Sequence, residues 1–469
     1  MPQALKHAIV KPLLKKAGAE LEPQNYRPVS NLPILGKLIE SAIISQFNDM
    51  HANNLHNPRQ SAYKKYHSTE TLLTRVHNDI TTNMNNGELT LLVMLDLSAA
   101  FDTIDHDILI KRLKGMYGIQ GTALQWFKSY MSDRSQSVII GNTESDRKLV
   151  KFGVPQGSKL GPILFNTYIA PLSKKVSNYD IQDQKYADDE QLILSYKPNT
   201  NANETESIKK MERCIENIQL FLHKNKLCNN SGNTEFLIIG SRQQLQKSQA
   251  CPLNVDGQII NKTENIRNLG VYFDKHLDMS RQVNNMCKNA YYNIRNISRI
   301  RNILDTHSTK TVVNALVTPH LDYGNGLLYG IKRKLINKLQ SAQNAAVRLV
   351  AKLNKFDSIT STRMELHWLP IPARVEYKLL TLTWKALNNQ SPEYISSLLK
   401  RKRSLGSLRS FNKNLLEVSN GPQNKWGERA FSYSAPRLWN KLPEHIKDSE
   451  TLLSFKKELK TYLFRKHYT

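Results

Sequence analysis

Acidic residues stand at the ends of two apolar runs that lie far apart in the chain. Asp96 follows residues 89–95 (LTLLVML), and Asp188 and Asp189 precede residues 191–195 (QLILS). The first run predicts a buried strand, and the second predicts the return strand of a hairpin that carries both aspartates at its tip. Two unit charges about 4 Å apart repel by roughly 4 kcal/mol at an effective dielectric constant near 20. A fold that gathers three carboxylates therefore needs cations between them, which points to two-metal phosphoryl transfer.

Each acidic stretch has an ordinary explanation when it is taken alone. Aspartates after strands are usually turn or cap residues, and a given tetrapeptide such as YADD (186–189) occurs by chance in roughly three of a thousand chains of this length. Between the two stretches, however, lies a turn rich in Gly and Pro at residues 153–162 (GVPQGSKLGP), and residues 163–172 (ILFNTYIAPL) then show helical spacing. The order of the three features makes coincidence the weaker explanation.

This order of carboxylate strand, PQG turn with helix, and YADD hairpin resembles the palm of reverse transcriptases. Further stretches resemble the polymerases of non-long-terminal-repeat retrotransposons of the Jockey and chicken-repeat type: residues 25–32 (NYRPVSNL), 60–70 (QSAYKKYHSTE), 268–274 (NLGVYFD), 320–323 (HLDY), 366–370 (LHWLP), 429–432 (RAFS) and 435–439 (APRLW). The resemblance implies an α+β right-hand polymerase with fingers, palm and thumb and a mostly helical C-terminal extension. We expect fingers and palm in residues 1–260, the primer-grip hairpin and thumb in 261–330, and the extension in 331–469.

The resemblance also implies the activity and its metal ions. We expect an RNA-directed DNA polymerase that adds deoxynucleotides to a primer 3′-hydroxyl with two Mg²⁺ ions, for which Mn²⁺ is the alternative. Asp96 and Asp188 are expected to bridge both ions, with Asp189 as a secondary ligand and the backbone carbonyl of Leu97 as a further one. Asp102 competes for this role, but the family pattern gives the metal to the first carboxylate, so Asp102 is expected to be a structural cap.

A nucleotide site is implied by four further positions: Arg27, Phe101, Gln156 and Gly157. The arginine would grip the triphosphate bidentately, and the aromatic ring would exclude a 2′-hydroxyl, although an ordinary core phenylalanine is the simpler alternative. The glutamine would contact the sugar, and the glycine would allow a close backbone approach. Lys64 and Lys65 could assist, but a solvated basic turn is the simpler interpretation.

Asn233 departs from the family pattern, which has Lys next to Thr-Glu at this place. That lysine is a candidate proton donor to the departing pyrophosphate, and an amide cannot deliver a proton. Lys226 is the nearest substitute. The second hypothesis for the chain is therefore a catalytically silent, diverged transposon remnant that only binds nucleic acid. Because only a short segment precedes Arg27, we do not expect this chain as given to supply the endonuclease of full-length elements.

Charge agrees with a nucleic-acid partner without identifying one. The formal net charge is +26 and the isoelectric point is near 9.7, which attracts phosphate backbones but would also suit a ribosomal or membrane-surface protein. We expect an RNA template, a DNA primer and deoxynucleoside triphosphates as partners, and a ribonucleoprotein with the chain's own transcript is compatible with them. We expect no membrane span, because no apolar run reaches 18 residues.

Cysteine spacing and a basic run bear on the compartment. The four cysteines, Cys214, Cys228, Cys251 and Cys287, match neither a zinc site nor a dense disulfide framework, which predicts reduced intracellular thiols. We expect the protein in the cytoplasm and nucleus. The KRKR run at 400–403 is a candidate nucleic-acid or nuclear-address segment, with a solvated turn as the alternative.

The apolar spacing also predicts local structure. We expect a loop at residues 196–208 before a helix at 209–224, and a thumb helix with an apolar stripe at Val312, Val313, Leu316 and Val317. The tryptophans of the C-terminal region could stack on bases, but buried core residues are the simpler interpretation.

Overall fold

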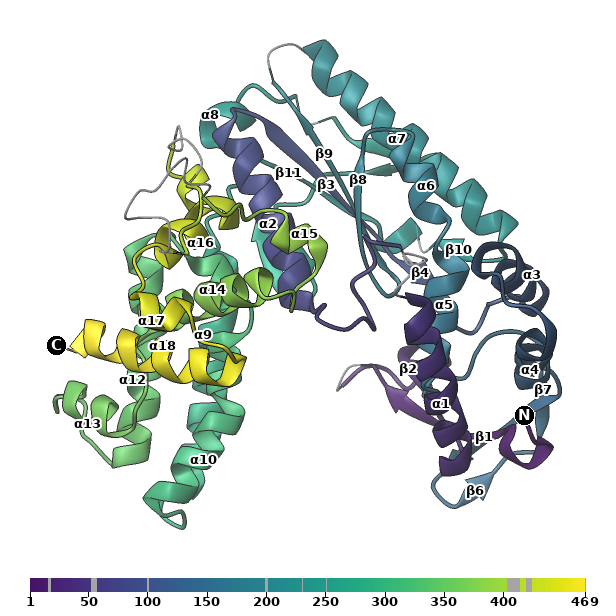
Figure 1. Ribbon diagram of the computed structural model, residues 1–469, viewed down its shortest axis with the longest axis horizontal. Coiled ribbons are helices and arrows are strands. Elements are labelled where there is room, and N and C mark those ends of the chain that lie inside the picture. The colour runs from purple at the N-terminus through teal and green to yellow at the C-terminus, as the bar shows by residue number, and fades with distance from the viewer. Residues whose placement is uncertain are drawn as a thin grey trace.

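The computed structural model describes residues 1–15, 18–51, 57–98, 101–198, 201–229, 231–249, 251–402, 414–418 and 424–468. Figure 1 shows an α+β molecule in which a central sheet joins two arms, one built around α1 and the N-terminal strands and the other from the helices that follow α9. The α+β class and the helical C-terminal region agree with the prediction from sequence. The basic stretch at 400–410 lies mostly outside the described residues.

The central sheet carries the predicted carboxylate strand. Its four antiparallel strands are ordered β11 (Glu235–Ile239), β3 (Leu89–Leu95), β9 (Asp189–Tyr196) and β8 (Gln182–Tyr186). Strand β3 contributes Leu91 and Val93 to one hydrophobic core and Leu92 to another. Because both faces are covered, the strand is a continuous apolar run instead of an alternating one. The predicted strands at 89–95 and 191–195 are thus confirmed.

Helices cover both faces of this sheet (Figure 1). One core includes residues of α3 (His106–Tyr117), α4 (Gly121–Met131), α5 (Gly161–Ile169), α6 (Leu172–Ser177) and α7 (Asn201–Lys224), and the other includes residues of α2 (Thr69–Asn85) and α9 (Ser280–Ile300). The predicted loop at 196–208 is wrong from residue 201 onward, where α7 begins. The carboxylate of Glu204 accepts hydrogen bonds from Ser248 and Gln249, and Ile208 is buried, so tertiary contacts stabilise a helical turn whose composition is polar.

A second sheet and several short elements complete the first half of the chain. The second sheet contains β1 (His7–Leu14), β2 (Tyr26–Asn31), β5 (Arg134–Ile140), β6 (Thr143–Glu144) and β7 (Lys148–Val150), with α1 (Ile34–His51) after β2. The short elements are β4 (Leu97–Ser98), β10 (Cys228–Asn229), α8 (Arg242–Leu245), β12 (Leu253–Val255), β13 (Gln258–Ile260), β14 (Asn265–Asn268) and β15 (Val271–Asp274). Short 3₁₀ helices occupy Gln3–Leu5, Pro23–Asn25, Ser231–Asn233, Asn325–Leu328 and Gly427–Arg429.

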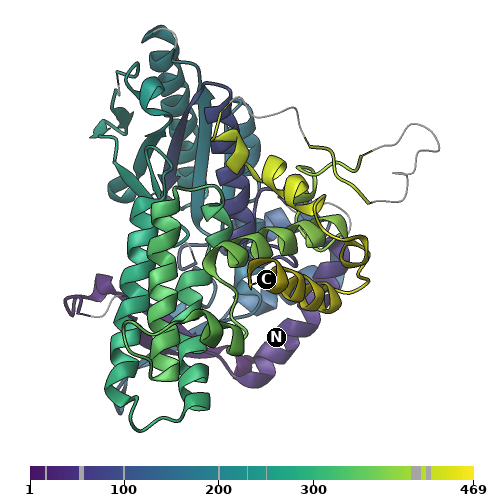
Figure 2. The same ribbon diagram turned by 90° about the vertical axis from the view of Figure 1, so that its left-hand side faces the viewer.

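The second half of the described chain is helical. Its helices are α10 (Thr306–Leu316), α11 (Thr318–Asp322), α12 (Arg333–Ala351), α13 (Thr360–Glu365), α14 (Ile371–Leu387), α15 (Glu393–Ser396), α16 (Phe431–Trp439), α17 (Glu444–Lys447) and α18 (Leu452–Tyr468). Figure 2 shows α9 and α12 side by side. In α10, Thr309 and Val313 are buried and Val317 follows them inward, whereas Leu316 is 48% exposed, so the predicted stripe is wrong at that residue.

Side chains of the C-terminal region fill a core of its own, which includes Trp384 and Trp439, and also join the core of α2 and the central sheet, which includes Trp368. Trp368, Trp384 and Trp439 are buried, which confirms the core interpretation for these three. Cys214 and Cys287 are buried free thiols, and Cys251 is a partly exposed one. Within the described part of the chain, no helix has the length and apolar content to cross a membrane.

Candidate active site

The ladder of the central sheet brings the three predicted carboxylates together. The last pair of β3 and β9 is Leu95 with Glu190, so Asp96 leaves the ladder beside the start of β9, which is Asp189. Strands β8 and β9 close on the pair Tyr186–Asp189, which leaves Ala187 and Asp188 as a two-residue tip. Ala187 has a φ of 58°, in the left-handed region that costs energy for a residue with a Cβ.

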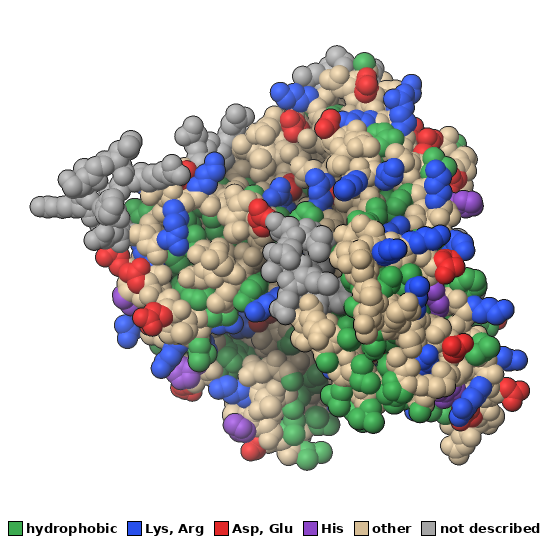
Figure 3. All heavy atoms as spheres, turned by 45° about the vertical axis from the view of Figure 1, so that its right-hand side comes forward, with side chains coloured by type: hydrophobic (Ala, Val, Ile, Leu, Met, Phe, Trp, Pro, Cys, Tyr) green, Lys and Arg blue, Asp and Glu red, His purple; other side chains and the backbone are tan. Residues whose placement is uncertain are grey.

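All three carboxylates line one cavity of about 930 Å³. The residues that line it are Lys15, Tyr26, Arg27, Pro28, Tyr63, Asp96, Leu97, Phe101, Asp102, Pro155, Gln156, Gly157, Pro162, Tyr186, Ala187, Asp188, Asp189 and Asn233. Every site residue predicted from the sequence is among them. The space-filling view shows the molecule hollowed between its two arms, with Lys and Arg side chains spread over both (Figure 3).

The carboxylates repel one another. Burial, with the neighbouring charges of Asp188 and Asp96, raises the pKa of Asp189 to about 6. Burial also raises the pKa of Asp188, with a further rise from Asp96, while the Arg27 guanidinium opposes the rise. A divalent cation would relieve this repulsion, because it would add two positive charges among the three carboxylates.

The donor atoms suit a hard divalent cation, since carboxylate oxygens are the ligands that Mg²⁺ prefers. Among the described residues, however, no three His, Cys, Asp or Glu side chains are close enough together to hold a metal ion as they stand. Asp96 also has a hydrogen-bond partner in the cavity: the amide of Asn233 donates to it, with 2.9 Å between Nδ2 and Oδ2. The sequence identified Asn233 as a missing proton donor, and the structure adds that its amide binds a predicted metal ligand.

The segment after Asp96 is braced by the PQG turn. Phe101 lines the cavity and also stacks on Phe165, with ring centroids 5.1 Å apart, so it has one face in the site and one in the core. The amide of Gln156 donates to the carboxylate of Asp102 at 2.8 Å. Asp102 is not a helix cap as predicted: the cap of α3 is Asp105, which accepts from the backbone of Ile108.

The close approach of β2 requires a glycine at position 157. Its φ is 124°, and a Cβ at this position would lie 2.5 Å from the backbone oxygen of Ser30 in β2. The backbone N–H of Ser30 in turn donates to the carbonyl of Gln156 at 2.7 Å. The close approach that the glycine permits is therefore made by β2, which carries Arg27 into the cavity.

The lysines considered from sequence lie elsewhere. The ammonium group of Lys64 donates a hydrogen bond to the backbone oxygen of Asn57, and burial lowers the pKa of Lys64 to about 8. Neither Lys64 nor Lys65 lines the cavity. Lys226 forms an ion pair with Asp105 at the start of α3 and does not line the cavity.

Several side chains that line the cavity were not predicted as site residues, among them Lys15, Tyr26 and Tyr63. Tyr63 has a φ of 61°, and burial with the nearby charge of Asp188 raises the pKa of its hydroxyl. Only its place in the 60–70 stretch, which resembles a fingers motif, could have indicated it.

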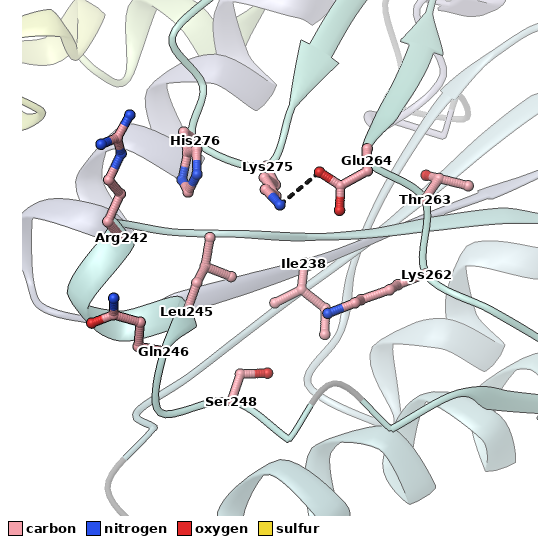
Figure 4. A pocket seen from close by; sticks show the side chains of 10 residues that line it. All are labelled: Ile238, Arg242, Leu245, Gln246, Ser248, Lys262, Thr263, Glu264, Lys275 and His276. Carbon is pink, nitrogen blue, oxygen red and sulfur yellow. Dashed lines mark ion pairs between the residues drawn. The ribbon is translucent and has the colours of Figure 1, made fainter.

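A second cavity, of about 330 Å³, contains none of the predicted residues. It lies beside α8 and β14, and its side chains include Arg242, Lys262 and His276 together with the ion pair between Lys275 and Glu264 at 2.6 Å (Figure 4). The carboxylate partly neutralises this basic group, and the cavity has no catalytic constellation.

Comparison with known proteins identifies the family. A model of the reverse transcriptases (RNA-dependent DNA polymerases) matches residues 14–273, more than half of the chain. The chain belongs to the reverse transcriptase family. The matched segment holds every site residue predicted from the sequence.

Two curated relatives of this reverse transcriptase come from mobile elements of Drosophila melanogaster. The probable RNA-directed DNA polymerase from transposon BS is 27% identical over 364 residues, covering 74% of this chain and 38% of that protein. The RNA-directed DNA polymerase from mobile element jockey is 26% identical, covering 75% and 38%. These relatives confirm the resemblance to non-long-terminal-repeat retrotransposon polymerases, and the chain spans about two fifths of their length. A solved structure of apo telomerase from Candida tropicalis is 11% identical over 84% of this chain and 69% of that one, with a TM-score of 0.42.

Proposed function

We propose that this reverse transcriptase is an active RNA-directed DNA polymerase that adds deoxynucleotides to a primer 3′-hydroxyl. The observation that carries the proposal is the convergence of Asp96, Asp188 and Asp189 in one cavity with Arg27, Phe101 and Gln156. We assign fingers and palm to residues 1–260, the primer grip and thumb to 261–330, and a helical extension to 331–469.

Asp96 and Asp188 would hold two Mg²⁺ ions, or Mn²⁺ in their place, with Asp189 and the carbonyl of Leu97 as further ligands. When bound, such ions lower the pKa of the primer hydroxyl and stabilise the leaving pyrophosphate. Asn233 donates to one of the two Asp96 oxygens, so a metal ion at that oxygen would share it with this hydrogen bond or compete with it.

The remaining side chains bind and orient the nucleotide. Arg27 projects its guanidinium from β2 into the cavity, where it can bind triphosphate oxygens bidentately. The ring of Phe101, supported from behind by Phe165, would occupy the space of a 2′-hydroxyl and so select deoxynucleotides. Gln156, fixed by Asp102, would contact the sugar.

The partners follow from the reaction and the charge. An RNA template, a DNA primer and deoxynucleoside triphosphates are all polyanions, and a chain with a net charge of +26 attracts them. A ribonucleoprotein with the chain's own transcript, in cytoplasm and nucleus, is consistent with these partners.

The second candidate function is nucleic-acid binding without catalysis. It is favoured by the bond between Asn233 and Asp96, because a metal ligand that is already engaged by an amide binds metal less readily. A primer-extension assay distinguishes the two candidate functions. It contains the purified full-length chain, a DNA primer annealed to an RNA template, deoxynucleotides and Mg²⁺. Polymerase activity predicts extension that EDTA abolishes, whereas a silent remnant would shift the primer–template in a gel without extending it with either Mg²⁺ or Mn²⁺.

A further inference from the structure

The tip of the YADD hairpin is held by a side chain from a distant part of the sequence. Gln60 precedes α2 and is 2% exposed. Its Oε1 accepts from the backbone N–H of Ala187 at 2.9 Å, and its Nε2 donates to the Ala187 carbonyl at 3.1 Å. One amide therefore satisfies both backbone groups of the residue between Tyr186 and Asp188. These are groups that a two-residue tip leaves outside the ladder of its own hairpin.

This double contact offsets local strain. Ala187 holds a positive φ of 58°, which a residue with a Cβ adopts at a cost unless its surroundings impose it. Because Asp188 follows directly, the conformation of Ala187 sets the direction in which that carboxylate leaves the backbone.

The Gln60 segment is itself fixed to the sheet. The N–H of Ser61 donates to the carbonyl of Lys185 at 2.8 Å, and the N–H of Lys185 donates to the carbonyl of Arg59 at 2.9 Å. The Gln60 side chain also accepts from the N–H of Ala62 at 3.0 Å. The glutamine thus has little freedom to leave Ala187 while these bonds persist.

The C-terminal region supplies the outer support of this segment. Tyr394, in α15, lies within hydrogen-bond distance of two hydroxyl groups, that of Ser61 at 2.8 Å and that of Thr71 at 3.0 Å. Its ring also meets His67 edge-on, with centroids 5.7 Å apart. Arg75 of α2 donates to the Tyr394 carbonyl at 2.9 Å. More than three hundred residues separate Tyr394 from these partners in the sequence.

We propose that Gln60 is a positioning residue for the catalytic aspartates, and that Tyr394 of the C-terminal region keeps it in place. The C-terminal region is then part of the polymerase unit, because it determines where Asp188 lies without touching it. This inference rests on the polymerase function proposed above where it is tested by the rate of nucleotide incorporation. Where it is tested by hydrogen–deuterium exchange, it rests on the hydrogen bonds alone.

Three variants of the full chain test the proposal. Gln60→Met keeps the length of the side chain and removes all three hydrogen bonds. Tyr394→Phe keeps the ring and removes only the hydroxyl. Tyr468→Phe is the matched control: its hydroxyl also makes two hydrogen bonds, to Arg363 and to the Trp368 carbonyl, but both partners lie in the C-terminal region.

The first measurement is hydrogen–deuterium exchange in the peptide that spans residues 183–190, and it needs no activity. Gln60→Met and Tyr394→Phe should each speed exchange at the Ala187 amide by at least ~10-fold, with Tyr468→Phe unchanged. Wild-type protection of this amide in Tyr394→Phe would overturn the role of the C-terminal region, and wild-type protection in Gln60→Met would overturn the whole proposal.

The second measurement is single-nucleotide incorporation under single-turnover conditions, with primer–template affinity measured in parallel. Both variants should slow incorporation by roughly 10- to 100-fold while the affinity changes less than about 2-fold, because a displaced carboxylate affects the reaction and not the grip on the duplex. A parallel loss of affinity and rate would indicate general loosening of the fold and would contradict positioning. An inactive wild type would refute the polymerase function and leave the exchange result to decide the contact.

Discussion

Asn233 makes the contact that bears most directly on catalysis at the scale of single residues. Its amide donates to one oxygen of Asp96, so a metal ion that binds this oxygen must either share it with the hydrogen bond or displace that bond. A hydrogen bond to a charged group is worth more than one between neutral groups, but this one is exposed to water, which weakens it. We therefore propose that Asn233, at the position where the resemblance implies a lysine, competes with the metal ion for Asp96.

We expect Asn233→Ala to lower the Mg²⁺ concentration for half-maximal primer extension by roughly 2- to 10-fold, the equivalent of one modest hydrogen bond. A Mg²⁺ titration of the extension rate measures this directly. Asn217→Ala is the control, because Asn217 lies on α7 away from the cavity and donates to the hydroxyl of Tyr179, which follows α6. An unchanged or raised Mg²⁺ requirement in Asn233→Ala would show that the amide helps to orient Asp96 instead of competing for it.

The three carboxylates could be predicted from sequence because each follows or precedes a strand that its own neighbours specify. The contacts of Asn233 with Asp96 and of Gln60 with Ala187 could not, since they join residues 137 and 127 positions apart. No local pattern marks an amide that will bind a backbone group in another element. Asp102 was wrongly expected to be a cap for a similar reason: its partner, Gln156, comes from a different turn.

At the scale of elements, the YADD hairpin is supported by a buried ionic cluster. Lys185 of β8 is almost fully buried and pairs with Asp183 at 2.8 Å and with Glu190 of β9 at 3.1 Å. These carboxylates raise the pKa of the lysine against the effect of burial, which lowers it. The charge of the buried Glu190 is thus matched by Lys185 from the neighbouring strand.

Lys185→Met should destabilise the fold by about 3–5 kcal/mol, because it removes the cation that pairs with buried Glu190 and leaves Asp183 with Arg59 alone as its ion-pair partner. Urea unfolding gives the change. Lys174→Met, an exposed lysine on α6, is the matched control and should change stability by less than about 0.5 kcal/mol. A loss of stability in Lys185→Met as small as that of the control would mean that the cluster does not hold the hairpin.

Boundaries and loops at this scale were predicted less well than strands. The apolar runs at 89–95 and 191–195 specify strands because both faces are buried. The first turns of α7 have few apolar residues, and their helical state depends on Glu204 binding a segment 44 and 45 residues away. Such a helix is determined by tertiary contacts that a window of neighbouring residues does not contain.

At the scale of the whole molecule, the C-terminal region wraps around α2, the helix that follows the predicted fingers block. Lys378 pairs with Glu70 at the start of α2 at 2.9 Å. Near its middle, the N–H of Ser432 donates to Asn78 at 2.9 Å, and Arg429 approaches His77 at 3.4 Å. Because α2 also packs on the central sheet, the C-terminal region and the catalytic sheet share one core.

His77 should make the stability of this junction depend on pH. Burial and the adjacent positive charge of Arg429 hold the pKa of His77 well below its usual value of 6.5. Near Arg429 lie Asp274 and Asp278, whose charges oppose the lowering of the Arg429 pKa that burial causes. The folded state therefore favours neutral His77, and the stability present above pH 6.5 is lost as the pH falls below that value, by at most about 1.4 kcal/mol per pH unit for one proton.

Urea midpoints between pH 7.5 and 5 should fall with pH in the wild type and fall less steeply in His77→Gln, which cannot take up a proton. Other histidines with lowered pKa values, such as His67, titrate in both proteins, so the difference between the two curves isolates His77. If the urea midpoints of the wild type and His77→Gln fell in parallel as the pH is lowered, His77 would be protonated in the folded state.

The central claim is that Asp96, and not Asp102, is the carboxylate that works with Asp188 and Asp189 in polymerisation. The decisive measurement is Mg²⁺-dependent extension of a DNA primer on an RNA template by wild type, Asp96→Asn and Asp102→Asn, each checked for folding by thermal unfolding. We predict a loss of at least ~10³-fold in rate for Asp96→Asn and less than about 10-fold for Asp102→Asn, which still offers an oxygen to Gln156 and keeps the brace partly intact. Comparable activity of Asp96→Asn and wild type, with Asp102→Asn inactive, would contradict the account.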